Sequence, residues 1–138
     1  TESVLLDNDP ATVALLHRMR DGGIRIALDD FGTGYSSLSY LRSFPFDKIK
    51  IDQTFVRDVA RRRDCVAIVA AIAQLARSLE MSTVAEGVEP EEHLAQVRIA
   101  GCTQAQGYLF SRPVPASEIV DVMDACRRRA TTCLAAVA

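Results

Sequence analysis

The spacing of hydrophobic residues along the chain predicts helices and short strands in alternation. Apolar residues three or four positions apart predict helices that begin at Asn8-Asp9-Pro10, cross Leu38 and Leu41, begin at Asp64, begin at Glu89-Pro90 and run from about Pro115 to Arg129. Short apolar runs predict strands at 24–28, 48–51, 83–85 and 103–106. Strands that alternate with helices form parallel β/α units, so we expect an α/β fold with four parallel strands. An open doubly wound sheet and part of a β/α barrel both fit this order.

The bulk composition indicates one soluble domain. Of the 138 residues, 49% are hydrophobic and 25% are charged, which is typical of globular proteins. We expect residues 1–129 to form the ordered domain and the weakly patterned residues 130–138 to fray. The net charge of -2 gives no reason to expect DNA as a partner. The longest strongly apolar stretch, Val66–Ala73, is too short to cross a bilayer, so we expect no direct membrane contact from this segment.

The cysteines and the chain start favour a cytoplasmic segment of a longer protein. The four cysteines lack CxxC spacing, which favours reduced thiols over a zinc site or disulfides. No signal-peptide pattern is present, and the chain starts at Thr1-Glu2 without a methionine. A membrane anchor elsewhere in a parent protein stays compatible with this expectation.

Polar residues gather at the carboxyl ends of the four predicted strands. They are Asp29, Asp30, Lys50, Asp52, Glu86, Glu89 and Gln106. The carboxyl ends of parallel strands lie on one face, where sites form, so we expect these side chains to share one rim. Adjacent carboxylates can bind two hard divalent cations, which suits in-line attack on a phosphodiester. A further carboxylate could act as a general base, and a lysine could orient water.

Most of these residues also have a purely structural interpretation. Asp29-Asp30 could form a turn and a helix cap, Lys50 could be a solvated lysine, and Glu89 could cap the helix at Pro90. Glu86 is harder to explain in this way, because a charged residue directly after an apolar strand needs a partner. The arginine runs 61–63 and 127–129 are typical of solvated or helix-end charges.

Four segments resemble the motifs of EAL domains. They are Asp29–Leu38 (DDFGTGYSSL), Lys48–Asp52 (KIKID), Val84–Glu89 (VAEGVE) and Gln106–Pro113 (QGYLFSRP). Their order and spacing agree with the family from Thr1 to about Met123. The resemblance implies a bacterial signalling domain with a modified TIM barrel, of which this chain forms about half. It also implies metal-dependent hydrolysis of cyclic di-GMP to linear pGpG with two Mg²⁺ or Mn²⁺ ions.

The resemblance implies a catalytic role for four residues at the rim. Asp29 would bind one metal ion, and Asp30 would bind the second ion or bridge both. Lys50 would orient the attacking water, and Glu86 would act as the general base or contact that water closely. These roles are expectations carried over from the family motifs.

The resemblance also implies supporting residues. Glu89, Gln106 and Asp52 would support the metal and water network, while Arg112 and Pro113 would lie on the substrate side. A loop of seven residues would couple dimerisation to metal binding, and Glu2 would tether it. The loop residues are Phe31, Gly32, Thr33, Gly34, Tyr35, Ser36 and Ser37.

The chain departs from the family pattern in its length. A complete domain of the family is nearly twice as long, and its other half carries the Glu-Ala-Leu motif and further metal ligands. We therefore expect this chain to be weakly active or inactive alone. A half barrel leaves strand edges unpaired and its inner apolar face open, so we expect a homodimer or swapped elements. Two alternatives remain: a degenerate EAL module that binds cyclic di-GMP or a protein without hydrolysis, and an unrelated metal-dependent barrel enzyme such as an enolase-like lyase.

Overall fold

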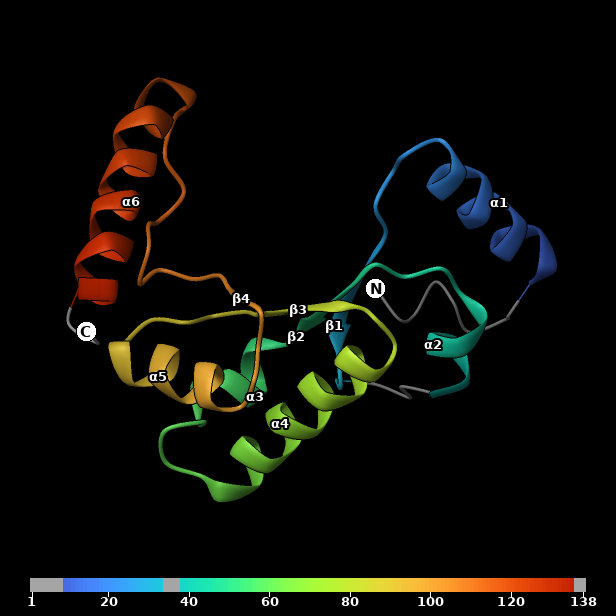
Figure 1. The fold of residues 1–138 in the computed structure, drawn as a ribbon, viewed down its shortest axis with the longest axis horizontal. Coiled ribbons are helices and arrows are strands. Elements are labelled where there is room, and N and C mark those ends of the chain that lie inside the picture. The colour runs from blue at the N-terminus through green and yellow to red at the C-terminus, as the bar shows by residue number, and fades with distance from the viewer. Residues whose placement is uncertain (1–8, 34–37, 136–138) are drawn as a thin grey trace.

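The computed structural model describes residues 9–33 and 38–135, which form one parallel sheet with helices around it (Figure 1). The strands are β1 (Ala27–Phe31), β2 (Lys48–Ile51), β3 (Ser82–Ala85) and β4 (Gln104–Ala105), in the spatial order β1-β2-β3-β4. The helices are α1 (Pro10–Asp21), α2 (Leu38–Ser43), α3 (Gln53–Arg57), α4 (Arg63–Ser78), α5 (Glu91–Ile99), the 3₁₀ helix η2 (Ala116–Glu118) and α6 (Ile119–Ala135). All neighbouring strands pair in parallel, as the sequence predicts.

One face of the sheet packs against helices and holds the core. Figure 1 shows α3, α4 and α5 gathered on one side of the strands. The strand residues buried in this core include Leu28, Ile49, Ile51 and Ala85, none of which is more than 3% exposed. Because side chains alternate along a strand, Lys48 and Lys50 of β2 point to the opposite face. The sheet therefore covers its apolar residues with helices and presents lysines on its other face.

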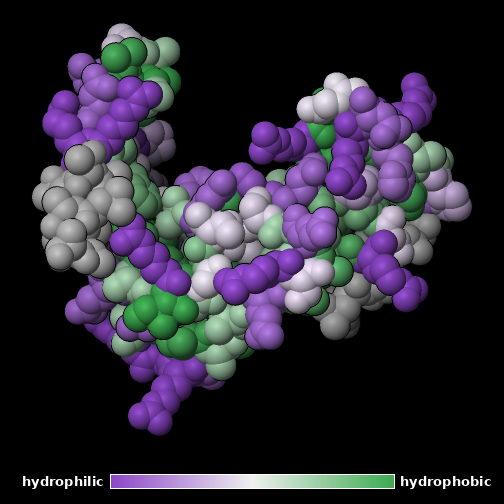
Figure 2. All heavy atoms as spheres, viewed as in Figure 1, coloured by the Kyte–Doolittle hydropathy of each residue, from purple (hydrophilic) through white to green (hydrophobic). Residues whose placement is uncertain are grey.

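The second face of the sheet is open between α1 and α6. Figure 2 shows a hollow between the two arms of the molecule that carry these helices. A cavity of ≈ 790 Å³ on this face is lined in part by Lys48, Lys50, Gln104, Val84 and Tyr108. Lys48 Nζ donates a hydrogen bond of 2.8 Å to Gln104 Oε1. The open face is thus mixed in polarity, because β2 turns its isoleucines toward the helices and its lysines toward the cavity. Association through this face stays a prediction.

The first strand lies further along the chain than its hydrophobic pattern predicts. The apolar run begins at Ile24, but Ile24 is 51% exposed and the strand begins at Ala27. Ile26 N donates to Asp47 Oδ2 at 2.8 Å, and Asp47 N donates to Ile26 O at 2.8 Å. The backbone groups of Ile26 are therefore hydrogen-bonded to Asp47, the residue before β2, and β1 begins one residue later. As a result, the acidic pair Asp29-Asp30 lies within the strand and not after it.

A short helix that hydrophobic spacing does not predict, α3, follows β2 directly. Asp52 is its N-cap, because Asp52 Oδ1 accepts a hydrogen bond of 2.8 Å from Thr54 N. The helix has 5 residues, which is too short for an apolar period to stand out. The capping aspartate after the strand was the local signal for this helix.

The last helix extends beyond its predicted end. α6 reaches Ala135, well into the segment 130–138 that we expect to fray, and that fraying stays a prediction. Within residues 9–33 and 38–135, no helix combines the length and the apolar character that a membrane span requires.

Candidate functional site

The acidic pair sits on a bulge in β1. Leu28 pairs with Ile49 and Phe31 pairs with Ile51, so Asp29 and Asp30 together oppose the single residue Lys50. In a regular strand two successive side chains would point to opposite faces. A bulge re-aims a side chain at the end of a pairing, and here it brings the carboxylates of Asp29 and Asp30 to one rim. Asp30 adopts a φ of 55°, a left-handed conformation that costs about 1 kcal/mol.

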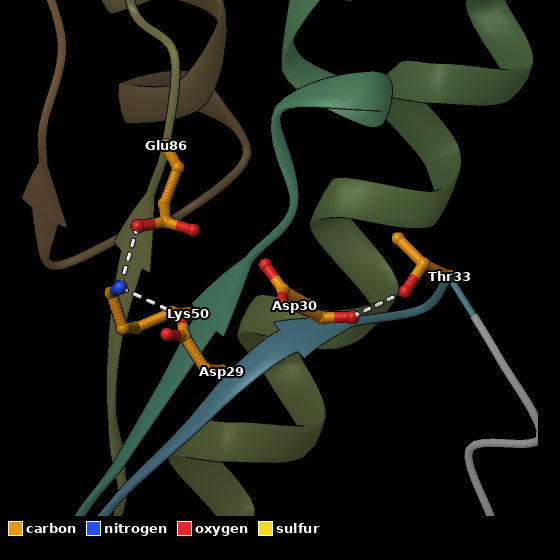
Figure 3. Close-up of polar contacts among 5 residues, drawn as sticks. All are labelled: Asp29, Asp30, Thr33, Lys50 and Glu86. Atoms are coloured by element: carbon orange, nitrogen blue, oxygen red, sulfur yellow. Dashed lines mark hydrogen bonds and ion pairs between the residues drawn. The ribbon is translucent and has the colours of Figure 1, made fainter. Parts of the chain in front are cut away.

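Lys50 lies between two carboxylates, one in β1 and one directly after β3 (Figure 3). Its Nζ atom is 2.7 Å from Asp29 Oδ1 and 2.7 Å from Glu86 Oε1. Partial burial acts to lower the pKa of Lys50, but the hydrogen bonds and charges of Asp29 and Glu86 outweigh burial and raise it. The hydrogen bond from Lys50 in turn lowers the pKa of Asp29. The lysine therefore stays protonated at neutral pH and holds the two carboxylates together.

Three carboxylates at this rim are placed to hold a divalent cation. One oxygen from each of Asp29, Asp30 and Glu86 lies within 4.8 Å of the others. Mg²⁺ and Mn²⁺ prefer oxygen ligands of this kind. Lys50 bonds one oxygen of Asp29 and one of Glu86, and the second oxygen of each carboxylate can act as a metal ligand. The donor set therefore fits a hard divalent metal ion.

A cleft of ≈ 280 Å³ opens beside the carboxylates. It is lined by Asp30, Asp52, Gln53, Glu86, Gly87, Glu89, Gln106, Gly107 and Tyr108. The structure thus brings the predicted supporting residues to the same cleft as Asp30 and Glu86. Asp52 also caps α3, so one of its carboxylate oxygens already accepts a backbone hydrogen bond.

Some residues of the cleft were missed by reasoning from the sequence. Gln53, Gly107 and Tyr108 line the cleft although no role was predicted for them. Gly107 and Tyr108 directly follow Gln106 in a recognised motif, which was the available signal. Gln53 had none, because its place depends on the unpredicted helix α3.

The remaining predicted residues lie around the cleft or outside the described chain. Arg112 stacks over Tyr108, with its Cζ atom 4.5 Å from the ring centroid. Arg112 and Pro113 line the open cavity together with Lys50. Thr33 Oγ1 donates to Asp30 O at 3.0 Å, so this part of the loop contacts the acidic pair. Glu2 and the loop residues 34–37 lie outside the described residues.

Comparison with known proteins identifies the family of this chain. The family model of the EAL domain matches residues 1–113. The chain belongs to the EAL domain family. It is 43% identical over 127 residues to the cyclic di-GMP phosphodiesterase NbdA of Pseudomonas aeruginosa, an alignment that covers 92% of this chain and 16% of NbdA.

Solved structures of this family share the fold. The PaMucR phosphodiesterase in complex with c-di-GMP is 43% identical and superposes with a TM-score of 0.74, over 79% of this chain and 44% of that one. Klebsiella pneumoniae BlrP1 in its manganese/cy-diGMP complex is 43% identical with a TM-score of 0.68, over 72% of this chain and 26% of that one. These neighbours confirm the prediction of a partial TIM-like barrel of EAL type. The chain spans only 15, 14 and 16% of the length of three curated relatives it matches.

The bridge formed by Lys50 can be tested by replacing Lys50 with methionine. We expect Lys50→Met to lower the free energy of unfolding at neutral pH, because Asp29 and Glu86 lose their shared cation. The pKa of Asp29 is lowered in the folded state, so its contribution is complete above the ordinary aspartate pKa of about 3.9 and disappears as pH falls through the lowered value. Urea denaturation from neutral to acidic pH should show the stability difference from the unaltered protein narrowing below about pH 4.

The matched control is Lys48→Met, which removes a lysine from the same strand. Lys48 bonds the neutral side chain of Gln104, so its loss leaves no carboxylates without their cation. The effect of Lys48→Met on the free energy of unfolding should therefore not change in the same acidic pH range. Asp29 is 40% exposed, and water therefore keeps the effect of its ion pair small. A stability difference for Lys50→Met that stayed constant down to the lowest pH would contradict the role of the ion pair.

Proposed function

We propose that the protein that contains this segment hydrolyses cyclic di-GMP to linear pGpG with two Mg²⁺ or Mn²⁺ ions. The observation that carries the proposal is the position of Lys50 between Asp29 and Glu86, beside Asp30, at one rim of the sheet. The Lys50 ammonium group, held between two carboxylates beside an open cleft, could stabilise negative charge on a phosphodiester and orient a water molecule. The names of the relatives, which include a cyclic di-GMP phosphodiesterase, support the same substrate.

Each residue of the rim has a role in this proposal. Asp29 and Asp30 would hold the metal ions, which would neutralise phosphate charge and make a bound water more acidic. Glu86 is the general base that accepts a proton from the attacking water. Lys50 Nζ, already fixed by two hydrogen bonds, orients that water and stabilises negative charge on the phosphate.

The supporting residues act through the cleft. Glu89 and Gln106 line it beside Glu86 and offer oxygen and amide groups to water or metal. Asp52 acts there with the oxygen that does not cap α3. Arg112, stacked on Tyr108, lines the open cavity with Pro113, on the proposed substrate side. Homodimer formation and a cytoplasmic location stay predictions.

The test compares the complete protein with the isolated 138-residue chain. We expect the complete protein to convert cyclic di-GMP to pGpG with added Mg²⁺ or Mn²⁺, and to lose that activity when a chelator removes the metal. The isolated chain should have at most about a hundredth of this activity, because a half site loses metal ligands and misplaces water. Product formation is measured by separating the nucleotides chromatographically.

Other outcomes would decide between the alternatives. Tight binding of cyclic di-GMP by the complete protein without any turnover would favour a degenerate module that binds nucleotide. Turnover of a carboxylate substrate, with no turnover of cyclic di-GMP, would favour a lyase and overturn the proposal. Full activity of the isolated chain would show that the second half of the barrel is dispensable.

A further inference from the structure

We propose that Phe55 of α3 is a positioning residue for the acidic pair, because its ring supports Gly32 and so maintains the bulge that presents Asp30. Metal binding at Asp30 belongs to the proposed function, and the role of Phe55 therefore rests on it. Phe55 is the third residue of the short helix α3 and is not among the residues that line the cleft. Its influence on the site would pass through the backbone that follows Asp30.

The contact between Phe55 and Gly32 leaves no space between them. A methyl group at Gly32 would lie 2.6 Å from Phe55 Cε2 and 3.1 Å from Phe55 Cζ. A separation of 2.6 Å does not occur between non-bonded carbon atoms, so the ring already lies close against the bare backbone of Gly32. Phe55 is half-buried and packs on the core that includes Phe31, so its ring has little freedom to withdraw. The ring is thus a fixed surface against which this turn of the chain rests.

The acidic pair needs such a support because the backbone of Asp30 is strained. Asp30 has a φ of 55°, and Gly32, two residues later, has a φ of 102°. Strained conformations persist only where the surrounding structure holds them in place. Thr33 provides one restraint, since its N and Oγ1 atoms donate to Asp30 O at 3.4 and 3.0 Å. Thr33 belongs to the same turn, however, and moves with it, whereas Phe55 comes from a different element.

The segment from β2 to α3 is well suited to act as this external support. Asp52 caps α3 through Thr54 N at 2.8 Å, and Phe55 N donates to Asp52 O at 3.2 Å. The helix therefore follows rigidly from the strand that carries Lys50. The same segment contacts the acidic region twice, with Lys50 on Asp29 Oδ1 and with the ring of Phe55 on Gly32. Loss of the second contact would let the bulge relax and turn Asp30 away from Asp29.

The first experiment measures Mn²⁺ affinity in the complete protein carrying Phe55→Leu. The dissociation constant for Mn²⁺, measured from the electron paramagnetic resonance signal of the free ion, should rise about tenfold, as it does when groups that orient metal ligands are removed. The control is Phe46→Leu, a phenylalanine that is 6% exposed and stacks on Phe44 with ring centroids 5.8 Å apart. Phe46 precedes β2, at the end of the strand opposite the site. Its loss should lower the melting temperature and leave Mn²⁺ affinity within about twofold.

A double-mutant cycle separates contact from general destabilisation. Gly32→Ala should weaken Mn²⁺ binding in the unaltered protein, because the new methyl group meets Phe55. In the Phe55→Leu background the same substitution should have a clearly smaller effect, because the ring atoms that it meets are gone. The strain of alanine at a φ of 102° is present in both backgrounds and cancels in the comparison. If Phe55→Leu does not fold, Phe55→Met takes its place in the same cycle.

The possible results distinguish this role from the proposed function. If the unaltered protein neither binds Mn²⁺ nor hydrolyses cyclic di-GMP, the proposed function fails, and this role of Phe55 fails with it. If the unaltered protein binds Mn²⁺ but Phe55→Leu leaves the affinity unchanged, or the effects of the two substitutions simply add, Phe55 has no positioning role. An equal loss of Mn²⁺ affinity in Phe46→Leu would likewise overturn it, since the effect would then follow stability alone.

Discussion

Replacement of Asp30 by asparagine is expected to lower the rate of cyclic di-GMP hydrolysis by the complete protein by about 1,000-fold. A metal ion contributes several kcal/mol to the transition state, and each 1.4 kcal/mol or so corresponds to a factor of ten in rate. Asparagine removes the charge of Asp30 and keeps its shape. It also tolerates the left-handed φ of 55° at least as well as aspartate, so the bulge should persist. The measurements are initial rates at saturating Mg²⁺ and the affinity for Mn²⁺.

The matched control for this substitution is Asp21→Asn. Asp21 is the exposed last residue of α1, so the same chemical change occurs there away from the acidic rim. Its rate should stay within about threefold of the unaltered protein, as for most surface substitutions. If Asp30→Asn kept both the rate and the Mn²⁺ affinity of the control, Asp30 would not be a metal ligand.

Gly107→Ala is expected to destabilise the complete protein by about 3–5 kcal/mol, through overpacking and the loss of hydrogen bonds. A methyl group at Gly107 would lie 2.1 Å from Val88 O and 2.4 Å from Val88 N, which are backbone atoms that cannot rotate away. Val88 N donates to Gln106 O at 3.0 Å, and Leu109 N donates to Val88 O at 3.0 Å. The chain must separate at this point, and both hydrogen bonds would be lost. Urea denaturation followed by circular dichroism measures the change.

The control for Gly107→Ala is Gly23→Ala. Gly23 has a φ of 86°, but a methyl group there meets no atom within 4 Å. It should therefore cost only the backbone strain of about 1 kcal/mol. Equal losses of stability in the two variants would show that the close approach of Val88 and Gly107 is not a significant constraint. Because Gln106 and Tyr108 line the cleft on either side of Gly107, we also expect this variant to lose activity at temperatures where it is still folded.

The sequence predicts the convergence of the site well, because parallel strands have a simple geometry. Four polar strand ends were expected at one rim, and Lys50 bonds Asp29 and Glu86 across three neighbouring strands. The strand at Lys48–Ile51 has the predicted boundaries, since its alternating pattern has a buried and an open face. These features follow from local patterns and one rule of topology.

The details that escaped prediction depend on contacts between distant residues. The first strand begins at Ala27 because Asp47 occupies the backbone of Ile26, and hydrophobic spacing carries no sign of that contact. The bulge at Asp29-Asp30 is visible only when β1 is paired with β2. The sequence shows a glycine at position 107 but does not show that Val88 is the residue it lies against. Each of these features decides how the cleft is shaped, although none decides which residues reach it.

The bulge in β1 also affects which alternative pairings with β2 are possible. If β1 paired without its extra residue, Asp30 would occupy the row that Leu28 and Phe31 fill, on the side covered by helices. Its carboxylate would then be buried without a partner, which costs several kcal/mol. The regular pairing of β1 is therefore less stable here than the bulged pairing. Neutralising Asp30 as asparagine would lessen that penalty but not remove it, because a buried amide also needs hydrogen-bond partners. The charge of Asp30 therefore adds to the preference of β1 for the bulged register.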